Sequence, residues 1–273
     1  MNRRQAVPGW IENLARVGYA TKGAVYLLIG MLAGAAAVKA GGETTDPQGA
    51  LATLVRQPFG ILLSAAAAFG LAAYSAWRTA QGLLDAEGKG SEAKGIAVRI
   101  GYVGSGLIHA GLAWTAAKLA LGWPGESGSA TRDATAWLMA LPWGRWLVGA
   151  IGCGVVSFGL QQFHKSYSMK FRRRLELDQM SPRQEEFAGR SAQFGLAARG
   201  VVFVLIGGFF LSAAWSHDAR ETGGLGDALR TLETQAYGPA LLGITAMGLV
   251  AYGLFMFVES KFHRIRKRRP RSN

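Results

Sequence analysis

Residues 16–30 read RVGYATKGAVYLLIG and open an apolar segment that continues to Val38. The pattern returns as RIGYVGSGLIHAGLA at residues 99–113 and as QFGLAARGVVFVLIG at residues 193–207. Each copy leads into an apolar segment long enough to enter a lipid bilayer. The sequence therefore predicts a chain made of three tandem copies of one membrane unit.

Six runs of the sequence contain no Asp, Glu, Lys or Arg and are 16 to 25 residues long: 23–38, 57–77, 100–117, 146–163, 200–216 and 234–258. A helix needs about 20 mostly apolar residues to cross the hydrocarbon, and flanking Lys or Arg side chains can snorkel. Helices are expected because unpaired backbone groups are costly in lipid and the runs are too long for barrel strands. We therefore expect an all-α, polytopic membrane protein with six transmembrane helices. A secretory signal is rejected for the first run, because its pattern recurs deep in the chain.

The repeat can be checked by register, because glycines recur at matching positions. Gly18, Gly101 and Gly195 correspond near the start of each unit, and Gly60, Gly144 and Gly238 correspond in its second half. The spacing between the two sets is 42, 43 and 43 residues. Each unit is then a two-helix repeat, and three such units in the same orientation predict a pseudo-threefold arrangement.

The units are expected at residues 10–84, 93–168 and 187–262 of a single membrane domain, followed by a basic tail at residues 263–273. A short outer helix is expected between the two spans of each unit, after Asp46-Pro47 and near residues 132–141 and 225–235. Ser181-Pro182-Arg183-Gln184 has the pattern of a capping box and predicts the start of a helix that leads into the fifth span.

The distribution of Lys and Arg predicts the orientation in the membrane. Of the 30 basic residues, 23 lie on the side of the chain termini. That side carries a net charge of +14 and the other side −1, which together give the formal net charge of +13. The positive-inside rule then places both termini in the cytoplasm. Trp123, Trp137, Trp143, Trp146 and Trp215 gather toward the outer boundary, as an interfacial aromatic belt would.

The chain resembles a family of bacterial integral-membrane proteins of the domain of unknown function 1206 type, which carry three tandem two-helix units opening with Arg-x-Gly-Tyr-x-x-x-Gly. Residues 16–23 and 99–106 have this motif, whereas the third copy departs from it at Gln193 and Leu196. The resemblance covers about residues 10–260. It implies the fold and a multi-pass location in the bacterial inner membrane, and it carries over no catalytic residue.

The first helix of each unit presents one face at positions 0, +3, +7, +10 and +14. Small and aromatic residues on this face are typical of helix packing. Alternatively, three such faces surround a central intramembrane site, for which the candidates are Tyr19, Tyr26, Tyr102 and His109. His109 is the main candidate, since ionisable groups inside spans tend to face a bundle interior or cavity. A neutral His can also simply donate one hydrogen bond to a neighbouring backbone carbonyl.

A second set of candidates comprises the basic residues near the cytoplasmic ends of the spans: Arg16, Lys22, Arg78, Arg99, Lys165 and Arg199. Positive-inside anchoring and snorkelling account for such residues. The alternative is a mouth that binds an anionic lipid headgroup or an acidic solute.

Motifs of standard catalysis are missing from the sequence, and no cofactor is expected. There is no phosphate-binding loop, no His-Glu-x-x-His and no nucleophile elbow. The four histidines fall in different segments, so no metal site is expected. Cys153 is the single cysteine, which excludes an intrachain disulfide, and it is expected to pack as a small residue.

The expected partners are the lipid bilayer and anionic phospholipid at the cytoplasmic face, which residues 172–174 and the basic tail would attract. A membrane-protein partner or a homo-oligomer is also compatible with the sequence. Nucleic acid is not expected, because stacking aromatics are sparse in the basic segments and a recognition fold is missing. The predicted function is a non-enzymatic membrane or envelope component. The alternative is a transporter or channel for a small solute or ion, with its central site near His109.

Overall fold

The computed structural model describes residues 9–39, 44–86, 88–123, 130–169, 172, 175 and 177–262. Within this part of the chain the secondary-structure elements are all helices. Six of them are long and apolar enough to cross a membrane, which confirms the predicted fold class. They are α1 (Gly9–Ala37), α3 (Gly60–Leu83), α4 (Ala93–Ala120), α6 (Gly144–Ser168), α7 (Pro182–Ser216) and α9 (Gly238–Phe262). The basic tail at residues 263–273 lies outside the described residues.

The short helix predicted inside each unit is present three times among the described residues. These helices are α2 (Pro47–Val55), α5 (Ala130–Met139) and α8 (Leu225–Glu233). Asp46 caps α2 as predicted, and its side chain accepts a hydrogen bond from the Gly49 backbone at 2.8 Å. In chain order each short helix follows the first span of its unit, and we call the span ends next to the short helices the short-helix side. We call the other span ends, which include the loops after α3 and α6, the start of α1 and the end of α9, the terminus side.

The predicted capping box is present at the start of α7. The Gln184 backbone donates to Ser181 Oγ at 3.3 Å, and the Ser181 backbone donates to Gln184 Oε1 at 2.9 Å. Pro182 occupies the first turn, where its missing N–H costs no helical hydrogen bond. The cap lies well before the apolar run, so α7 extends to 35 residues.

The glycine that opens the second helix of each unit is required by a close approach of the chain. A Cβ at Gly60 would lie 2.0 Å from the carbonyl oxygen of Val55, and at Gly144 and Gly238 the corresponding distances to preceding carbonyl oxygens are 2.0 and 1.8 Å. No larger residue fits at such distances. The recurring glycine is therefore the point at which the chain leaves the short helix and turns into the next span.

The closest helix pairs join neighbouring repeats, and they are α3–α4, α6–α7 and α1–α9. The glycines of the predicted face lie in these interfaces. A Cβ at Gly23 would be 2.8 Å from the Gly253 carbonyl oxygen, and one at Gly106 would be 2.5 Å from Thr79 Oγ1. Small residues allow such backbone approach between transmembrane helices. For these glycines the packing interpretation is confirmed.

Within the repeats, two hairpins are packed and one is open. Helices α1 and α3 pack against each other, as do α7 and α9, whereas α4 and α6 share no comparable interface among the described residues. A Cβ at Gly18 would lie 2.6 Å from Tyr74 Cα and one at Gly195 2.5 Å from Tyr252 Cα, yet one at the matching Gly101 meets nothing within 4 Å. A pseudo-threefold arrangement implies the same packing within each hairpin. This packing is present in the first and third hairpins and missing from the second.

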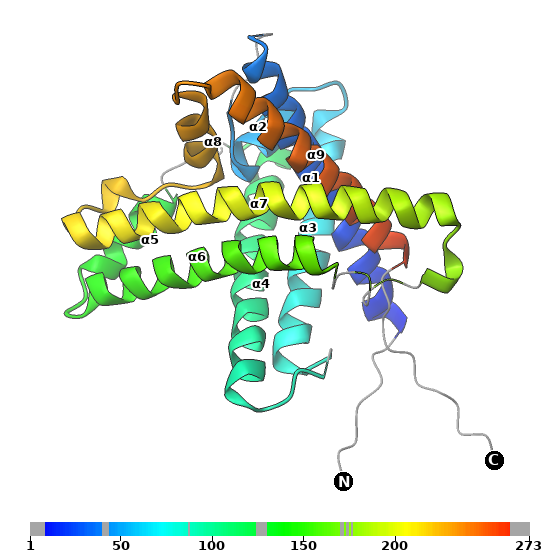
Figure 1. Cartoon of the computed structure of the whole chain (residues 1–273), viewed down its shortest axis with the longest axis horizontal. Helices are drawn as coiled ribbons and strands as arrows, with labels where there is room; N and C mark the ends of the chain where they lie inside the picture. Colours follow the sequence, from blue (N-terminus) through cyan, green and yellow to red (C-terminus); the bar gives the residue numbers. More distant parts are fainter. Residues whose placement is uncertain are drawn as a thin grey trace.

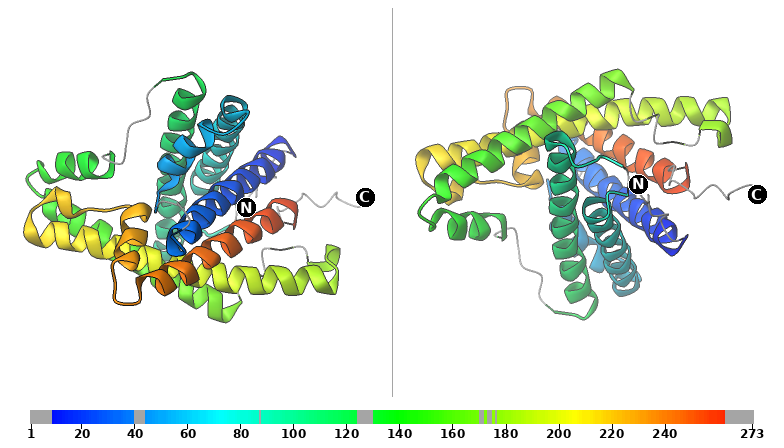
Figure 2. Two further views of the ribbon diagram at one scale, coloured as in Figure 1. Left: turned by 90° about the horizontal axis from the view of Figure 1, so that it is seen from above. Right: turned by 90° about the horizontal axis from the view of Figure 1, so that it is seen from below.

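The spans follow one another in the order α4–α3–α1–α9–α7–α6, with an opening between the first and the last. Figure 1 shows the α3–α4 pair running across the direction of the α6–α7 pair, with α1–α9 between them. The views from above and below show the same fan of three pairs (Figure 2). Helix α4 is accordingly the most exposed of the six spans. Cys153 on α6 is exposed, so the expectation that it is a small packing residue was wrong.

Candidate functional site

Three basic side chains from three different spans converge inside the bundle. Lys22 lies on α1, Arg78 on α3 and Arg199 on α7. Lys22 is 5% exposed and Arg199 7% exposed, while Arg78 is half-buried. We call these three residues the cationic cluster.

Tyr74 on α3 holds two members of the cationic cluster. Its hydroxyl accepts a hydrogen bond from Lys22 Nζ at 2.9 Å and another from Arg78 Nε at 2.7 Å. Arg78 also donates to Oε1 of the fully buried Gln81 at 3.0 Å. Because Lys22 belongs to α1 and Tyr74 to α3, this contact links the two helices of the first hairpin.

Aromatic rings surround the third member, Arg199. Its guanidinium carbon lies 4.2 Å from the ring centroid of Tyr252, 5.0 Å from that of Phe203 and 5.4 Å from that of Tyr26. Such cation–π contacts each contribute about 0.5–2 kcal/mol. The contact with Tyr252 links α7 to α9 in the third hairpin. Arg199 Nε is buried without a hydrogen-bond partner among the described residues.

Positive charge exceeds negative charge at this site. The buried acidic side chain in its electrostatic range is Glu259 on α9, which is 5% exposed and acts on Lys22. Three basic side chains against this one carboxylate give a formal excess of two positive charges among the residues described here. Taking an unpaired ion out of water costs several kcal/mol, so buried charges are normally paired. The arrangement is typical of a site that receives an anion.

The four residues predicted for a central site all lie around the cationic cluster. Trp77 Nε1 donates to the Tyr19 hydroxyl at 3.4 Å, and the Tyr26 ring is 4.8 Å from that of Tyr252. The Tyr102 ring lies 5.2 Å from the Arg78 guanidinium. The His109 ring lies 4.5 Å from that of Tyr74, and its Nδ1 is 2.7 Å from the Ser105 carbonyl oxygen. Their predicted role as a site stays a prediction.

The six basic residues predicted for a mouth divide into two groups. Three of them form the cationic cluster, Lys165 Nζ lies 5.8 Å from the ring centroid of Phe158 on its own helix, and Arg16 and Arg99 bind backbone carbonyls. Arg16 donates to the Lys261 carbonyl at 2.7 Å, and Arg99 donates to the carbonyls of Gly82 and Leu83 at 2.7 and 3.0 Å. Basic side chains commonly bind the last carbonyls of a helix in this way. These contacts fit the anchoring interpretation of the mouth.

Tyr74 and Tyr252 were not among the predicted site residues. Both occupy the same position in the repeat, where the second unit has Phe158. A tyrosine inside an apolar span usually needs a partner for its hydroxyl when it is buried, and this signal was available in the sequence. The matching position on the first helix of each unit carries Lys22, Ser105 and Arg199. The cation and the tyrosine thus occur together in units one and three and are both missing from unit two.

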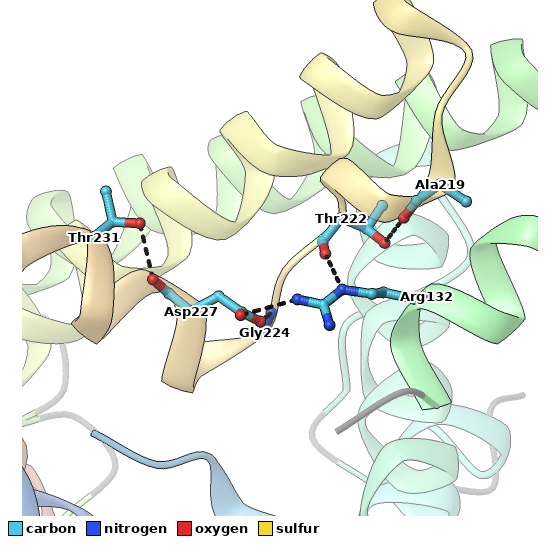
Figure 3. A network of polar contacts seen from close by, with 6 residues as sticks. All are labelled: Arg132, Ala219, Thr222, Gly224, Asp227 and Thr231. Carbon is cyan, nitrogen blue, oxygen red and sulfur yellow. Dashed lines mark hydrogen bonds and ion pairs between the residues drawn. The ribbon is translucent and has the colours of Figure 1, made fainter. Parts of the chain in front are cut away.

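A second polar region lies on the short-helix side. It is an open pocket of about 360 Å³ whose lining includes Arg132, Arg220, Arg230 and Asp227. Arg132 on α5 lies 3.1 Å from an Asp227 carboxylate oxygen and donates to the Thr222 carbonyl at 3.3 Å (Figure 3). Asp227 also accepts from the Gly224 backbone at 2.9 Å. The contacts of Arg132 join the second repeat to the third, which indicates a structural role.

Six apolar helices in three tandem hairpins define the chain as a multi-pass membrane protein of unknown activity. The family model of the Domain of Unknown Function DUF1206 matches residues 17–85, 100–168 and 194–263, so the chain belongs to this family. It is 32% identical to the uncharacterized protein YxxB of Bacillus subtilis over 256 residues, which cover 94% of this chain and 92% of the relative. The predicted family resemblance is thereby confirmed. No solved structure matches the chain.

Proposed function

We propose that this protein is a non-enzymatic component of the bacterial inner membrane that binds the anionic headgroup of a phospholipid at the cationic cluster. The observation that carries the proposal is the convergence of three cations from three spans: Lys22 and Arg78 bind the Tyr74 hydroxyl, and Lys22 and Arg199 both lie over the Tyr252 ring. A membrane phosphate supplies the missing negative charge together with several hydrogen-bond acceptors.

The donor groups of the cluster suit a phosphate. Arginine presents planar N–H donors that match phosphate oxygens, and lysine adds a point charge. Arg199 Nε has no acceptor among the described residues, so it can donate to a ligand without breaking a contact. The tyrosine rings attract the cations but carry no negative charge, and they therefore leave the net charge of the site unchanged.

The charge distribution supports a site on the cytoplasmic side. Arg78 lies five residues before the end of α3 and Glu259 three residues before the end of α9, so both lie toward the terminus side. The terminus side holds 23 of the 30 basic residues, and the positive-inside rule assigns such a side to the cytoplasm. The basic tail and loops would concentrate anionic lipid near the site.

The test is native mass spectrometry of the protein in nanodiscs that contain equal amounts of phosphatidylglycerol and phosphatidylcholine. The wild type is expected to retain phosphatidylglycerol with a preference of about tenfold or more, and Arg199→Gln is expected to lose most of this preference. Arg183→Gln is the matched control, because Arg183 is exposed on the terminus side of α7. An unchanged preference in Arg199→Gln would refute the proposal.

Transport of a small anionic solute is the second candidate function. It is favoured by the position of the cationic cluster inside the spans and by the contact of His109 with Tyr74, which holds two of the cations. Proteoliposomes should then show anion flux above that of empty liposomes, and His109→Ala should change its rate. Wild-type protein that shows no flux across a panel of phosphate and carboxylate solutes would contradict this candidate.

A further inference from the structure

The opening between α4 and α6 lies where the other two hairpins are most tightly packed. In the first hairpin a Cβ at Gly70 would lie 2.6 Å from Thr21 Cβ, and in the third a Cβ at Gly248 would lie 2.2 Å from Ala198 Cβ. The matching positions of the second hairpin are Gly154 on α6 and Gly104 on α4, and an added Cβ at either meets nothing within 4 Å. We call the space along Gly101, Gly104 and Gly154 the seam.

Partly exposed rings on α4 and α6 contact residues of the cationic cluster or their direct neighbours. On the α4 side, Tyr102 and His109 are half-buried, and they contact Arg78 and Tyr74 respectively. On the α6 side, Phe158 is 39% exposed and packs edge-on against Phe203 at 4.9 Å. Phe203 in turn lies over Arg199. The helices that border the seam therefore also carry the groups that line the site.

The sequence explains why the two helices of the second hairpin are not linked to each other. In the other hairpins a cation on the first helix contacts a tyrosine on the second: Lys22 with Tyr74 and Arg199 with Tyr252. The second hairpin has Ser105 and Phe158 at these positions. Neither side chain carries a charge and Phe158 has no hydroxyl, so the link that joins the helices elsewhere cannot form.

From this geometry we propose that the seam receives the acyl chains of the phospholipid whose headgroup binds the cationic cluster. The ligand is then an amphiphile, with its anionic end among Lys22, Arg78 and Arg199 and its apolar end between α4 and α6. This inference rests on the proposed function and specifies the ligand class and its path. Three observations carry it: the ring contacts that α4 and α6 make with the cluster and its neighbours, the missing link in the second hairpin, and the buried Arg199 Nε that has no partner in the described structure.

The glycines of the seam, at which an added Cβ meets no neighbour, suit an acyl chain. An acyl chain is flexible and needs a smooth apolar surface, which small residues on neighbouring helices provide. The headgroup fixes the position of the acyl chain, because the phosphate must reach cations that the Tyr102 and Phe203 rings contact. A free phosphate would bind the same cations but would not occupy the seam. An experiment that detects occupancy of the seam can therefore distinguish a phospholipid headgroup from a free phosphate.

The experiment uses full-length protein in nanodiscs that contain phosphatidylglycerol with a photoactivatable diazirine in one acyl chain. After illumination, the labelled residues are mapped by mass spectrometry. The double variant Gly104→Leu/Gly154→Leu fills the seam at positions where an added side chain meets no neighbour, so it should fold. Gly208→Leu on α7 is the matched control, because a Cβ there also meets nothing within 4 Å.

The expected result is labelling concentrated on α4 and α6. This labelling should fall about tenfold in the double variant and stay unchanged in Gly208→Leu. Inorganic phosphate at millimolar concentration should not displace the labelled lipid. Fluorescence-detected size-exclusion chromatography establishes that each variant is folded before labelling.

The alternative outcomes have different meanings. The seam would be refuted as the acyl-chain site if the labelling lay outside α4 and α6, or if the double variant did not reduce it. If the preference for phosphatidylglycerol were retained in that case, the headgroup site would still be supported. Displacement of the lipid by inorganic phosphate would refute the proposal that the ligand is an amphiphile and would indicate a site for a free anion. Loss of any preference for phosphatidylglycerol over phosphatidylcholine in the wild type would refute the proposed function itself.

Discussion

The substitution Tyr74→Phe removes one oxygen atom and tests whether the cationic cluster is held as described. The Tyr74 hydroxyl accepts from Lys22 Nζ at 2.9 Å and from Arg78 Nε at 2.7 Å. Phenylalanine fits the backbone at this position of the repeat, since Phe158 is its counterpart in the second unit. The variant therefore removes two hydrogen bonds to charged donors with little change in packing.

The expected loss of stability follows from those two bonds. Hydrogen bonds to charged groups contribute about 1.5–3 kcal/mol each in soluble proteins, whereas bonds between transmembrane helices average about 0.6 kcal/mol. Arg78 retains Gln81 as an acceptor, and the Lys22 ammonium loses its contact with Tyr74. We expect Tyr74→Phe to lower the free energy of unfolding by about 2 kcal/mol, which corresponds to a fall in Tm of about 4–8 °C.

The assay is thermal unfolding in mild detergent, followed by the intrinsic fluorescence of the eight tryptophans. Tyr237→Phe is the matched control, because the same atom is removed from a side chain that is 78% exposed. The double variant Tyr74→Phe/Lys22→Met should regain part of the loss, since it also removes the buried charge that the single variant leaves without its acceptor. If Tyr74→Phe melts within 1 °C of Tyr237→Phe, the described link between α1 and α3 does not exist.

Three further predictions concern packing, surface charge and sidedness. Gly195→Ala should destabilise the protein by about 3 kcal/mol, because a Cβ would lie 2.5 Å from Tyr252 Cα, whereas Gly101→Ala should melt like the wild type. Equal melting temperatures for the two variants would contradict the difference between the hairpins. Arg132→Gln should cost less than about 1 kcal/mol in the same assay, since its ion pair with Asp227 is solvent-exposed. In a Cys153→Ser background, a membrane-impermeant thiol reagent should label Thr234→Cys in intact cells and Ser91→Cys only after lysis, and the reverse pattern would invert the proposed orientation.

Most of the fold could be predicted because it depends on local sequence patterns. Charge-free runs mark the spans, Asp46-Pro47 and Ser181-Pro182 mark helix starts, and glycines such as Gly60 mark the turns. Each of these signals acts within a few residues, through the length of an apolar run, a capping hydrogen bond or a close backbone approach. The open second hairpin could not be predicted from glycine register alone, because Gly101 has the same spacing as Gly18 and Gly195.

The candidate site was predicted in two parts that the structure brings together. Tyr19, Tyr26, Tyr102 and His109 were assigned to the membrane interior, and Lys22, Arg78 and Arg199 to its cytoplasmic boundary. Sequence position along a helix gives the depth of a residue in the membrane but not the tilt of the helix or its partners. Only the packing of α1, α3, α7 and α9 shows that the cations lie among the tyrosines instead of at the surface.

The asymmetry among the repeats has a physical consequence for binding. A ring of three identical hairpins would present the same approach to a central site three times, and each approach would be closed by the same cation–tyrosine contact. In this chain Lys22 with Tyr74 and Arg199 with Tyr252 close two of them, whereas Ser105 and Phe158 leave the third without a link. Loss of a cation and a hydroxyl from one copy therefore does two things together. It leaves the basic side chains of the cluster on the other two repeats, and it leaves α4 and α6 unjoined, which is what the proposed entry of a ligand with one charged end and one apolar end requires.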